Sequence, residues 1–244
     1  GETLDSIIDQ LDNVAMEQVE IVIVDGASTD NTQAVIENYQ QRFKNLVYVR
    51  LPQKGGVDKD YTETVKHASG NYCWLMSDDD LIKQGAIAKV LAATEKQYDL
   101  IIVNAEVRSA DFSRLIAPSL LTLKQDRVYS ASENESFFAD TATFMSFIGC
   151  VVIKRQCWNE RASEPYFGTE FVHIGAIFQQ PLKGSILVLA TPFISIRYNN
   201  ASWTSRYFEI WMIKWPTLAW SFTHYSDAAK QCVVPKEPWR NPKI

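Results

Sequence analysis

The sequence predicts an α/β fold in which helices flank a mixed, mostly parallel sheet. Short apolar runs rich in β-branched residues alternate with amphipathic segments of helical periodicity through the first half of the chain. This alternation is typical of strand–helix–strand units, which form parallel neighbours through right-handed crossovers. The length of 244 residues suits one α/β domain with a small appendage.

The elements of the first half follow one another at regular spacing. An amphipathic helix over residues 1–11 opens the chain, with Leu4, Ile7, Ile8 and Leu11 on one face. An α/β domain normally opens with a strand, so either this domain does not, or the chain lacks its natural start. The following strands are then expected: residues 19–24, 46–51, 72–76 and 100–103. The following helices are expected between them: residues 32–43, 57–69 and 85–97.

The second half is less regular, and residues 108–128 are expected to form loop or short strand. Helices are expected at residues 133–141 and 170–179. Strands are expected at residues 147–153 and 185–198, the second broken by Pro192. We therefore expect one domain over residues 1–204, with a regular half at 1–105 and a less regular half at 106–204. Residues 205–244 would add a C-terminal aromatic helix and an extended tail.

The C-terminal helix, expected over residues 205–222, carries an aromatic and aliphatic stripe that Pro216 should kink. The stripe consists of Phe208, Trp211, Trp215, Leu218 and Phe222, and Trp203, Tyr207 and Trp220 add aromatic surface. Such a stripe usually packs on the core. Its tryptophans, with Arg206 and Lys214, also suit peripheral contact with the inner face of a membrane.

The composition indicates which partners and which cellular compartment to expect. The net charge of −5 indicates no general polyanion-binding surface, so we expect no nucleic-acid partner. The four cysteines form no CxxC pair, which suits a reducing cytoplasm. No apolar run reaches the ~18 residues that a membrane span requires, and no secretory signal opens the sequence. We expect a cytoplasmic protein.

Three consecutive carboxylates, Asp78, Asp79 and Asp80, follow the expected strand at residues 72–76. Open α/β sheets bind their ligands at the carboxyl ends of strands. Adjacent negative charges repel one another, and hard cations such as Mg²⁺ or Mn²⁺ neutralise them through carboxylate oxygen. The pattern therefore indicates a metal site held by Asp80 with help from Asp78. The alternative is an acidic turn before a helix, whose N-terminus favours aspartate.

Asp25 ends the expected strand at residues 19–24, so it should lie at the same edge of the sheet. It could accept a hydrogen bond from a pyrimidine base, while the metal bridges a diphosphate and stabilises the departing nucleotide. Lys54, Lys59 or Arg197 could add positive charge near the phosphates, although such residues are mostly solvated surface groups.

Transfer to a hydroxyl also needs a general base, and the second half offers Glu170 and His173. Glu170 opens the expected helix, and His173 lies three residues further along on the same face. For Glu170 the alternative role is a favourable charge at a helix N-terminus. For His173 it is a buried structural histidine.

Two segments together carry a resemblance to a known family. Residues 20–32 read EIVIVDGASTDNT, and residues 68–80 read ASGNYCWLMSDDD. They resemble the nucleotide-binding strand and the metal motif of family 2 glycosyltransferases with the GT-A fold. The likeness covers residues 1 to about 105 well and the rest loosely. It implies that the first strand of the family is absent here.

The resemblance implies a role for each matching residue. Asp25 matches the aspartate that contacts the nucleotide base, and Asp58 falls in a region that often contacts the nucleotide or sugar. Asp78 and Asp80 match the metal motif. Glu170 lies where the family places its acidic base, although the usual Glu-Asp pair reads Glu-Phe here.

Three further segments are similar to bacterial abequosyltransferase-like enzymes of O-antigen assembly. They read VDKDY at residues 57–61, CWLMSDDD at 73–80, and ASW followed by RYF within residues 201–208. Such enzymes transfer a 3,6-dideoxyhexose from a CDP-sugar to a lipid-linked oligosaccharide. Direct displacement would invert the anomeric carbon, as is common in family 2, whereas this likeness leaves the stereochemistry open.

The leading hypothesis is thus a metal-dependent glycosyltransferase of surface polysaccharide synthesis. Departures from the family pattern are Gly26 in place of a second aspartate and Ser77 in place of the first motif aspartate. A non-catalytic sugar-nucleotide-binding protein of the same fold is the first alternative. A sugar nucleotidyltransferase is the second, but it would require a glycine-rich basic loop after the first strand.

Overall fold

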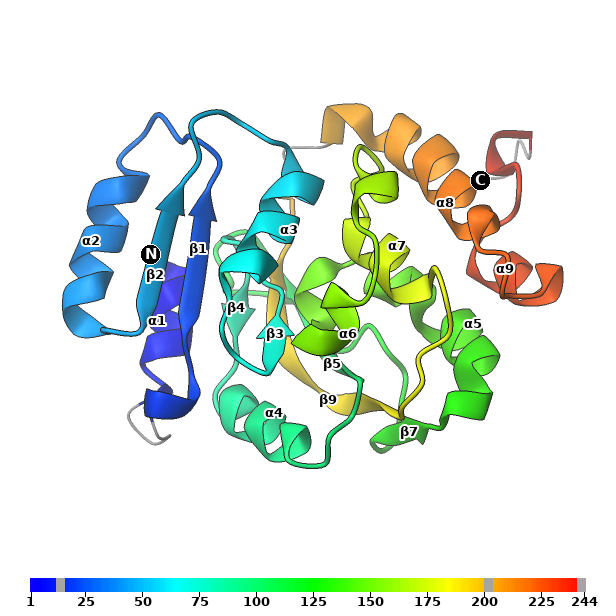
Figure 1. Cartoon of the computed structure of the whole chain (residues 1–244), viewed down its shortest axis with the longest axis horizontal. Coiled ribbons are helices and arrows are strands. Elements are labelled where there is room, and N and C mark those ends of the chain that lie inside the picture. Colours follow the sequence, from blue (N-terminus) through cyan, green and yellow to red (C-terminus); the bar gives the residue numbers. More distant parts are fainter. Residues whose placement is uncertain (12–15, 200–203, 241–244) are drawn as a thin grey trace.

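The large sheet of the protein has the strand order β3-β8-β5-β9-β4 (Figure 1). The computed structural model describes residues 1–11, 16–199 and 204–240. The strands of the large sheet are β3 (Tyr72–Trp74), β8 (Val151–Lys154), β5 (Leu100–Arg108), β9 (Ile186–Arg197) and β4 (Leu81–Ile82). At its margins β6 (Leu115–Ala117) pairs with β5, and β7 (Arg127–Tyr129) pairs with β9.

A separate two-stranded sheet forms from β1 (Ile21–Asp25) and β2 (Leu46–Arg50), which pair in parallel across α2 (Thr32–Arg42). Within the described residues, no strand pairing joins this sheet to the large one. A cleft of about 2170 Å³ lies between the two sheets, lined by β1 on one side and by the β3 segment on the other.

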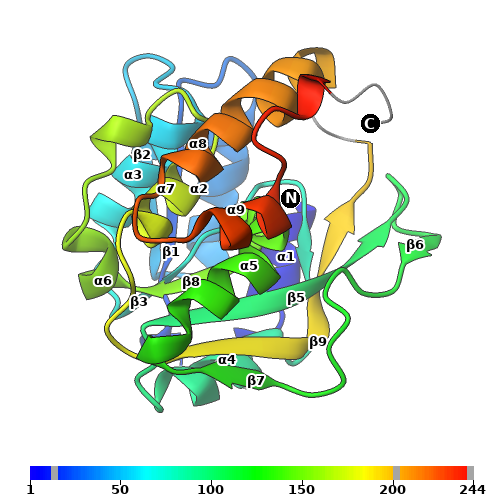
Figure 2. The same cartoon turned by 90° about the vertical axis from the view of Figure 1, so that its right-hand side faces the viewer.

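Helices cover both faces of the large sheet. They are α1 (Glu2–Ile8), α3 (Val57–His67), α4 (Ala86–Thr94), α5 (Asn134–Met145), α6 (Arg155–Asn159), α7 (Val172–Phe178), α8 (Trp215–Ser221) and α9 (Asp227–Val233). Figure 2 shows α4 on one side of the sheet and α5, α7, α8 and α9 on the other. Successive side chains of β5 point to these opposite faces, because strands alternate with period two. Leu100 and Ile102 pack with the α5–α7–α8 side, whereas Ile101 and Val103 pack with α4.

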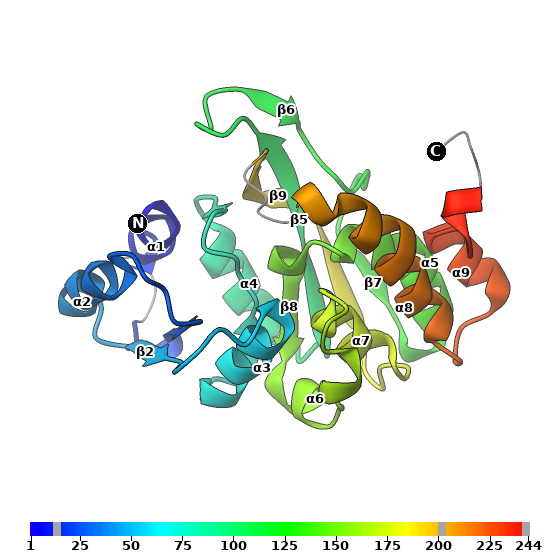
Figure 3. The same cartoon turned by 90° about the horizontal axis from the view of Figure 1, so that it is seen from above.

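A smaller core holds the two-stranded sheet against the rest of the molecule. Leu4, Ile8 and Leu11 from the α1 segment pack with residues of α2 and β2, and also with Ile82 and Ile87. The expected inward face of the first helix is therefore confirmed for these three residues. Seen from above in Figure 3, α1, α2 and β2 form a unit beside α3 and α4.

The α/β class and the mixed sheet are confirmed, but the prediction of mostly parallel pairing is wrong. In the large sheet β5 and β9 are parallel, whereas β3–β8, β8–β5 and β4–β9 are antiparallel. Strands β3 and β5 still share one direction, because both are antiparallel to β8. The later strand β8 inserts between them, and a strand-by-strand pattern in the sequence cannot reveal such an insertion.

The C-terminal helix differs from the expected kinked α-helix. Residues Glu209–Lys214 form a π-helix, which continues directly into α8 with Pro216 in its first turn. Proline donates no backbone hydrogen bond, so the change of helix type falls where an α-helical bond would be missing. Phe208, expected on the inner face, is 62% exposed, whereas Trp215, Leu218 and Phe222 are buried. Trp203 lies outside the described residues.

In the parts of the chain that the structure describes, no helix has both the length and the apolar character needed to cross a membrane.

Candidate active site

The cleft between the two sheets brings together the acidic site residues that the sequence predicts. Its lining includes Asp25, Asp58, Asp78, Asp80 and Glu170. They come from the end of β1, the first turn of α3, the turn after β3 and the loop before α7. Lys54 and Lys59, which the sequence offered as positive charges near the phosphates or as ordinary surface groups, are exposed and do not line the cleft.

Asp25 is a buried carboxylate at the C-terminal end of β1. Its Oδ1 accepts a hydrogen bond of 2.7 Å from the backbone N–H of Ser28, and its Oδ2 accepts one of 2.6 Å from the Tyr48 hydroxyl. Burial acts to raise the pKa of Asp25, but the bonds from Ser28 and Tyr48 outweigh it and lower the pKa below its usual value. A fixed, charged hydrogen-bond acceptor thus lies on the wall of the cleft.

The acidic turn after β3 presents its three carboxylates differently. Asp80 is buried, and its two oxygens accept hydrogen bonds from the Ser77 hydroxyl (2.7 Å) and the backbone N–H of Arg197 (2.9 Å). Burial raises the pKa of Asp80 to about 6, although these two hydrogen bonds oppose the shift. Asp78 is exposed, and Asp79 is half-buried. The turn therefore has one inward carboxylate and one that faces solvent.

The side chain of Arg197 braces this turn. Its Nε donates to the carbonyl of Asp79 at 3.0 Å, and its terminal nitrogens contact the Ala110 carbonyl and the Glu2 carboxylate. Arg197 lines the cleft. Its guanidinium is engaged with protein groups, so it fixes the shape of the acidic turn.

The donor set of this turn fits a hard divalent cation. Among the described residues, no three His, Cys, Asp or Glu side chains converge as a protein cage for a metal. Magnesium, however, is usually held by one or two carboxylates together with substrate phosphates and water. Asp78 is exposed to the cleft, and each oxygen of Asp80 has a second lone pair beyond its present hydrogen bond. The assignment of Asp80 and Asp78 as ligands stays a prediction.

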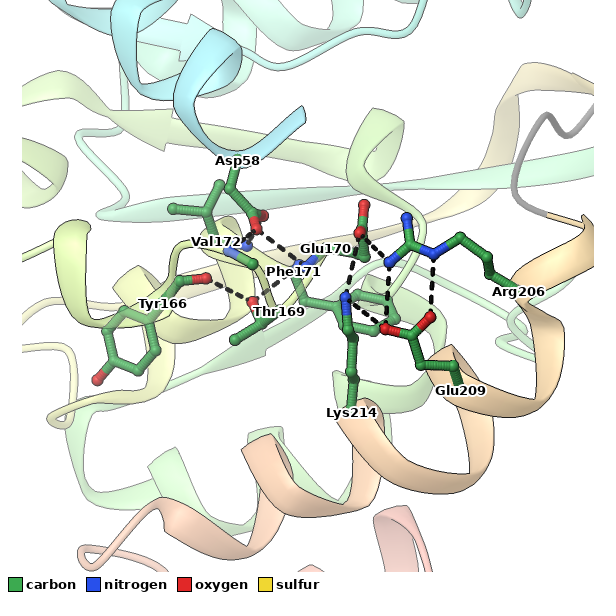
Figure 4. Close-up of polar contacts among 10 residues, drawn as sticks. Asp58, Tyr166, Thr169, Glu170, Phe171, Val172, Arg206, Glu209 and Lys214 are labelled. Atoms are coloured by element: carbon green, nitrogen blue, oxygen red, sulfur yellow. Dashed lines mark hydrogen bonds and ion pairs between the residues drawn. The ribbon is translucent and has the colours of Figure 1, made fainter. Parts of the chain in front are cut away.

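Asp58 contacts the loop before α7 rather than open space (Figure 4). Its Oδ2 accepts hydrogen bonds from the backbone N–H groups of Gly168 (2.8 Å) and Glu170 (3.0 Å), and its Oδ1 accepts one from Val172 (2.9 Å). Burial raises the pKa of Asp58, and the three N–H groups oppose that shift. The expected contact of Asp58 with nucleotide or sugar stays a prediction, and its carboxylate is already occupied by this loop.

The sequence reasoning missed Asp60, two residues further along α3. A Cβ atom on Gly26 would lie 2.8 Å from Asp60 Oδ2, so the side chain reaches the loop that follows Asp25. Asp60 lines the cleft, and burial raises its pKa. The signal in the sequence was the pair of small residues, Gly26 and Gly55, that make room for it.

Both the backbone and the side chain of Glu170 are held, the first by Asp58 and the second by two cations. Its backbone adopts φ of +72°, a left-handed conformation that is unfavourable for a residue with a side chain. Its Oε1 accepts from Arg206 at 2.8 Å and from Lys214 at 3.3 Å, and Glu209 also pairs with both cations (Figure 4). The sequence showed Arg206 and Lys214 as charges on the last helix but not their contact with Glu170.

His173 is buried at the wall of the same cleft. It is 1% exposed, and its Nε2 donates to the carbonyl of Met145 at 2.8 Å, because a carbonyl oxygen can only accept. Burial lowers its pKa to about 4, so the ring is neutral near pH 7. Of the two candidate bases, the geometry favours Glu170.

Comparison with known proteins adds the family. Residues 1–153 match the family described as glycosyl transferase family 2. The chain belongs to glycosyl transferase family 2. The resemblance read from the two sequence segments is thereby confirmed.

Among solved structures, this family 2 chain is similar to Staphylococcus aureus TarS 1–349 in complex with UDP-GlcNAc. The TM-score is 0.68 at 16% identity, over 95% of this chain and 66% of that one. At this identity the likeness shows the fold alone, and it confirms the GT-A architecture.

Two curated relatives are informative for this family 2 domain. The chain is 23% identical over 201 residues to the abequosyltransferase RfbV of Salmonella typhimurium, covering 77% of this chain and 60% of that protein. It is also 23% identical over 169 residues to a Campylobacter jejuni GalNAc(5)-diNAcBac-PP-undecaprenol beta-1,3-glucosyltransferase, covering 68% of this chain and 52% of that protein. The chain thus spans about half to three-fifths of the length of these two relatives.

Proposed function

We propose that this chain is the catalytic domain of a glycosyltransferase that moves a sugar from a nucleotide-diphosphate donor to a hydroxyl of a lipid-linked oligosaccharide in surface polysaccharide synthesis. The observation that carries the proposal is the meeting of Asp25, the acidic turn and Glu170 in one cleft of a family 2 domain. The cleft thus holds a base-binding acceptor, an acidic turn for a cation and a candidate general base.

Each group has a distinct task in this reaction. Asp25 accepts a hydrogen bond from the nucleotide base, and Asp80 with Asp78 would hold Mg²⁺ or Mn²⁺. The ion, when bound, neutralises charge that develops on the departing diphosphate. Glu170 removes the proton of the acceptor hydroxyl as the new glycosidic bond forms. Both cations that pair with Glu170 bind Oε1, so we assign Oε2 to the acceptor.

The donor we favour is a CDP-sugar, with a 3,6-dideoxyhexose such as abequose as the sugar. Support comes from the likeness to an abequosyltransferase over 77% of this chain. The polyprenyl-diphosphate-linked acceptor in the name of the second relative supports a lipid-linked acceptor. The similar structure that binds UDP-GlcNAc makes UDP-sugars the necessary comparison donors.

We place residues 1–204 in the transferase domain, with the donor bound by residues 1–105 and the acceptor by 106–204. Residues 205–244 form a C-terminal appendage. We further propose that the enzyme works in the cytoplasm, peripherally at the inner face of the membrane. Three apolar side chains in the segment before α8 support this membrane contact: Tyr207, Phe208 and Ile213. They are between 46% and 62% exposed and lie beside the cleft-lining Trp211.

The test is a panel of CDP- and UDP-sugars, each with and without Mn²⁺, read by thermal stabilisation and then by sugar transfer to a lipid-linked oligosaccharide extract. A ligand that binds the native state raises the melting temperature. We expect stabilisation by a CDP-sugar, enhanced by Mn²⁺, and transfer that depends on both. Absence of transfer with every donor, despite donor binding, would instead favour a non-catalytic sugar-nucleotide-binding protein.

A further inference from the structure

The loop that carries Glu170 is fixed by a single buried carboxylate, that of Asp58 (Figure 4). Asp58 is 4% exposed and accepts hydrogen bonds from the backbone N–H groups of Gly168, Glu170 and Val172, all between 2.8 and 3.0 Å. Hydrogen bonds to a carboxylate are stronger than those between neutral groups. Asp58 therefore constrains the loop at three alternate residues, with Glu170 in the middle.

The hydrogen bonds to Asp58 are made by a stretch of backbone with unfavourable φ angles. Gly168 has φ of +87° and Glu170 has φ of +72°, so two of the three donor residues are left-handed. Glycine adopts that conformation freely, but glutamate adopts it only where the surroundings impose it. The N–H of Glu170 is itself one of the groups bound by Asp58. The direction of the Glu170 side chain thus depends on this contact.

Asp58 also connects Glu170 to the donor side of the cleft. It lies in the first turn of α3, which packs against β1, the strand that ends in Asp25. Figure 1 shows α3 between the two-stranded sheet and the α7 segment. On the other side, Arg206 of the 3-10 turn Thr204–Arg206 and Lys214 of the π-helix Glu209–Lys214 bind the Glu170 carboxylate.

We propose that Asp58 is a positioning residue for the transfer reaction: it holds the backbone of Glu170 so that its carboxylate faces the acceptor hydroxyl. Asp58 acts through Glu170 and does not bind the donor. This inference rests on the proposed function and assigns to Asp58 a role different from the nucleotide or sugar contact that the sequence suggests.

A double-mutant cycle tests the proposal, with kcat and the donor KM measured for the donor and acceptor that give turnover in the panel above. We expect Asp58→Asn to lower kcat by about 10- to 100-fold, because small displacements of a catalytic group cost rates of this order, and to leave the donor KM within about twofold. In a Glu170→Gln background the same substitution should change kcat by less than about twofold, since residues that act as a unit are not additive.

The matched control is Asp99→Asn. Asp99 also accepts a backbone hydrogen bond, from Gly184 at 2.6 Å, but it does not line the cleft. The Asp99→Asn variant should have a kcat within about twofold of the wild-type value. A second variant, Asp58→Glu, keeps the charge but displaces the carboxylate by one methylene, so it serves if Asp58→Asn does not fold. We expect it to lower kcat in the same direction.

Amide hydrogen exchange supplies a readout independent of turnover. The amides of Gly168, Glu170 and Val172 should exchange faster in the Asp58 variants than in wild type. A rise in donor KM, or an equal loss of kcat in the Glu170→Gln background, would overturn the positioning role while leaving the proposed function intact. Absence of turnover by wild-type protein with every donor would remove the proposed function, and the catalytic role of Asp58 with it.

Discussion

The backbone N–H of Arg197 donates a hydrogen bond of 2.9 Å to Oδ1 of Asp80 and so ties the end of β9 to the acidic turn after β3. The two residues are 117 positions apart in the chain. Asp80 is thus both a proposed metal ligand and a contact between the two halves of the domain. Substitutions there must be judged by metal dependence as well as by loss of activity.

Asp80→Ala should abolish the part of the thermal stabilisation by a CDP-sugar that depends on Mn²⁺, because the ion loses its inward carboxylate. The measurement is the melting temperature with the sugar nucleotide, in the presence and absence of Mn²⁺. Asp126→Asn, a control at an acidic residue that does not line the cleft, should keep the full Mn²⁺ effect. Unchanged Mn²⁺-dependent stabilisation in Asp80→Ala would reject the metal assignment.

Asp25→Asn should weaken donor binding by roughly 10- to 100-fold, because hydrogen bonds to a charged partner contribute about 1.5–3 kcal/mol. Calorimetric titration with the free nucleotide diphosphate measures this loss without turnover. Asp30→Asn is the matched control, since Asp30 is exposed on the same loop and bonds to Thr32. Equal affinity in Asp25→Asn and wild type would show that the nucleotide base lies elsewhere.

Glu170→Gln should lower kcat by about 10²- to 10⁴-fold, the usual contribution of a general base, with donor affinity unchanged. Glutamine is nearly isosteric, so the fold should persist. Glu209→Gln is the control, because Glu209 pairs with the same Arg206 and Lys214 but does not line the cleft. If both variants lose activity equally, the ion-pair network and not the Glu170 base accounts for the effect.

His173 should make stability depend on pH. Its pKa is lowered to about 4 in the folded protein by burial, against an ordinary value near 6.5, so the unfolded chain takes up the proton first on acidification. The stability is present above about pH 6.5 and is lost as pH falls towards 4, by about 3 kcal/mol in all. His173→Gln cannot titrate, and its stability should fall less over this range in denaturant titrations at several pH values. An identical pH dependence in both proteins would assign the effect to other groups.

The exposed apolar side chains of Phe208 and Ile213, in the segment before α8, should bind anionic lipid vesicles. Phe208→Ser with Ile213→Ser should reduce vesicle binding by roughly tenfold or more, because immersing one large apolar side chain contributes about 1.5–3 kcal/mol. Ile116→Ser on β6 is a control at a residue of similar exposure, 42% against 46% for Ile213. Equal binding by all variants in sedimentation assays would remove the membrane proposal.

The sequence predicted the parts of the site that depend on local pattern. Asp25 and the three aspartates follow apolar strands directly, as the sequence indicates. The expectation that they share one sheet edge was wrong, because β1 and β3 lie in separate sheets and the residues meet across the cleft. The family motifs reinforce the same residues. Glu170 was placed by its position before a helix, and the structure brings it into the same cleft.

The remainder depends on contacts between distant segments. The hydrogen bonds between Asp58 and the loop that carries Glu170 join residues more than 100 positions apart in the sequence. Arg206, which pairs with Glu170, lies 36 positions from it. The insertion of β8 between β3 and β5 is likewise set by the tertiary structure and not by local sequence. The π-helix at Glu209–Lys214 stands in place of the α-helical turns that the three–four spacing predicts. None of these follows from periodicity alone.

The separation of the two sheets has a consequence for how the molecule unfolds. The β1–β2 unit packs with α1 and α2 on a small core that meets the main body at Ile82, Ala86 and Ile87, and among the described residues no backbone ladder connects the two sheets. Parts of a protein that share few contacts and no backbone ladder open at different free energies. The wall that carries Asp25 should therefore melt before the main body, and a donor that bridges the cleft should merge the two steps into one cooperative transition.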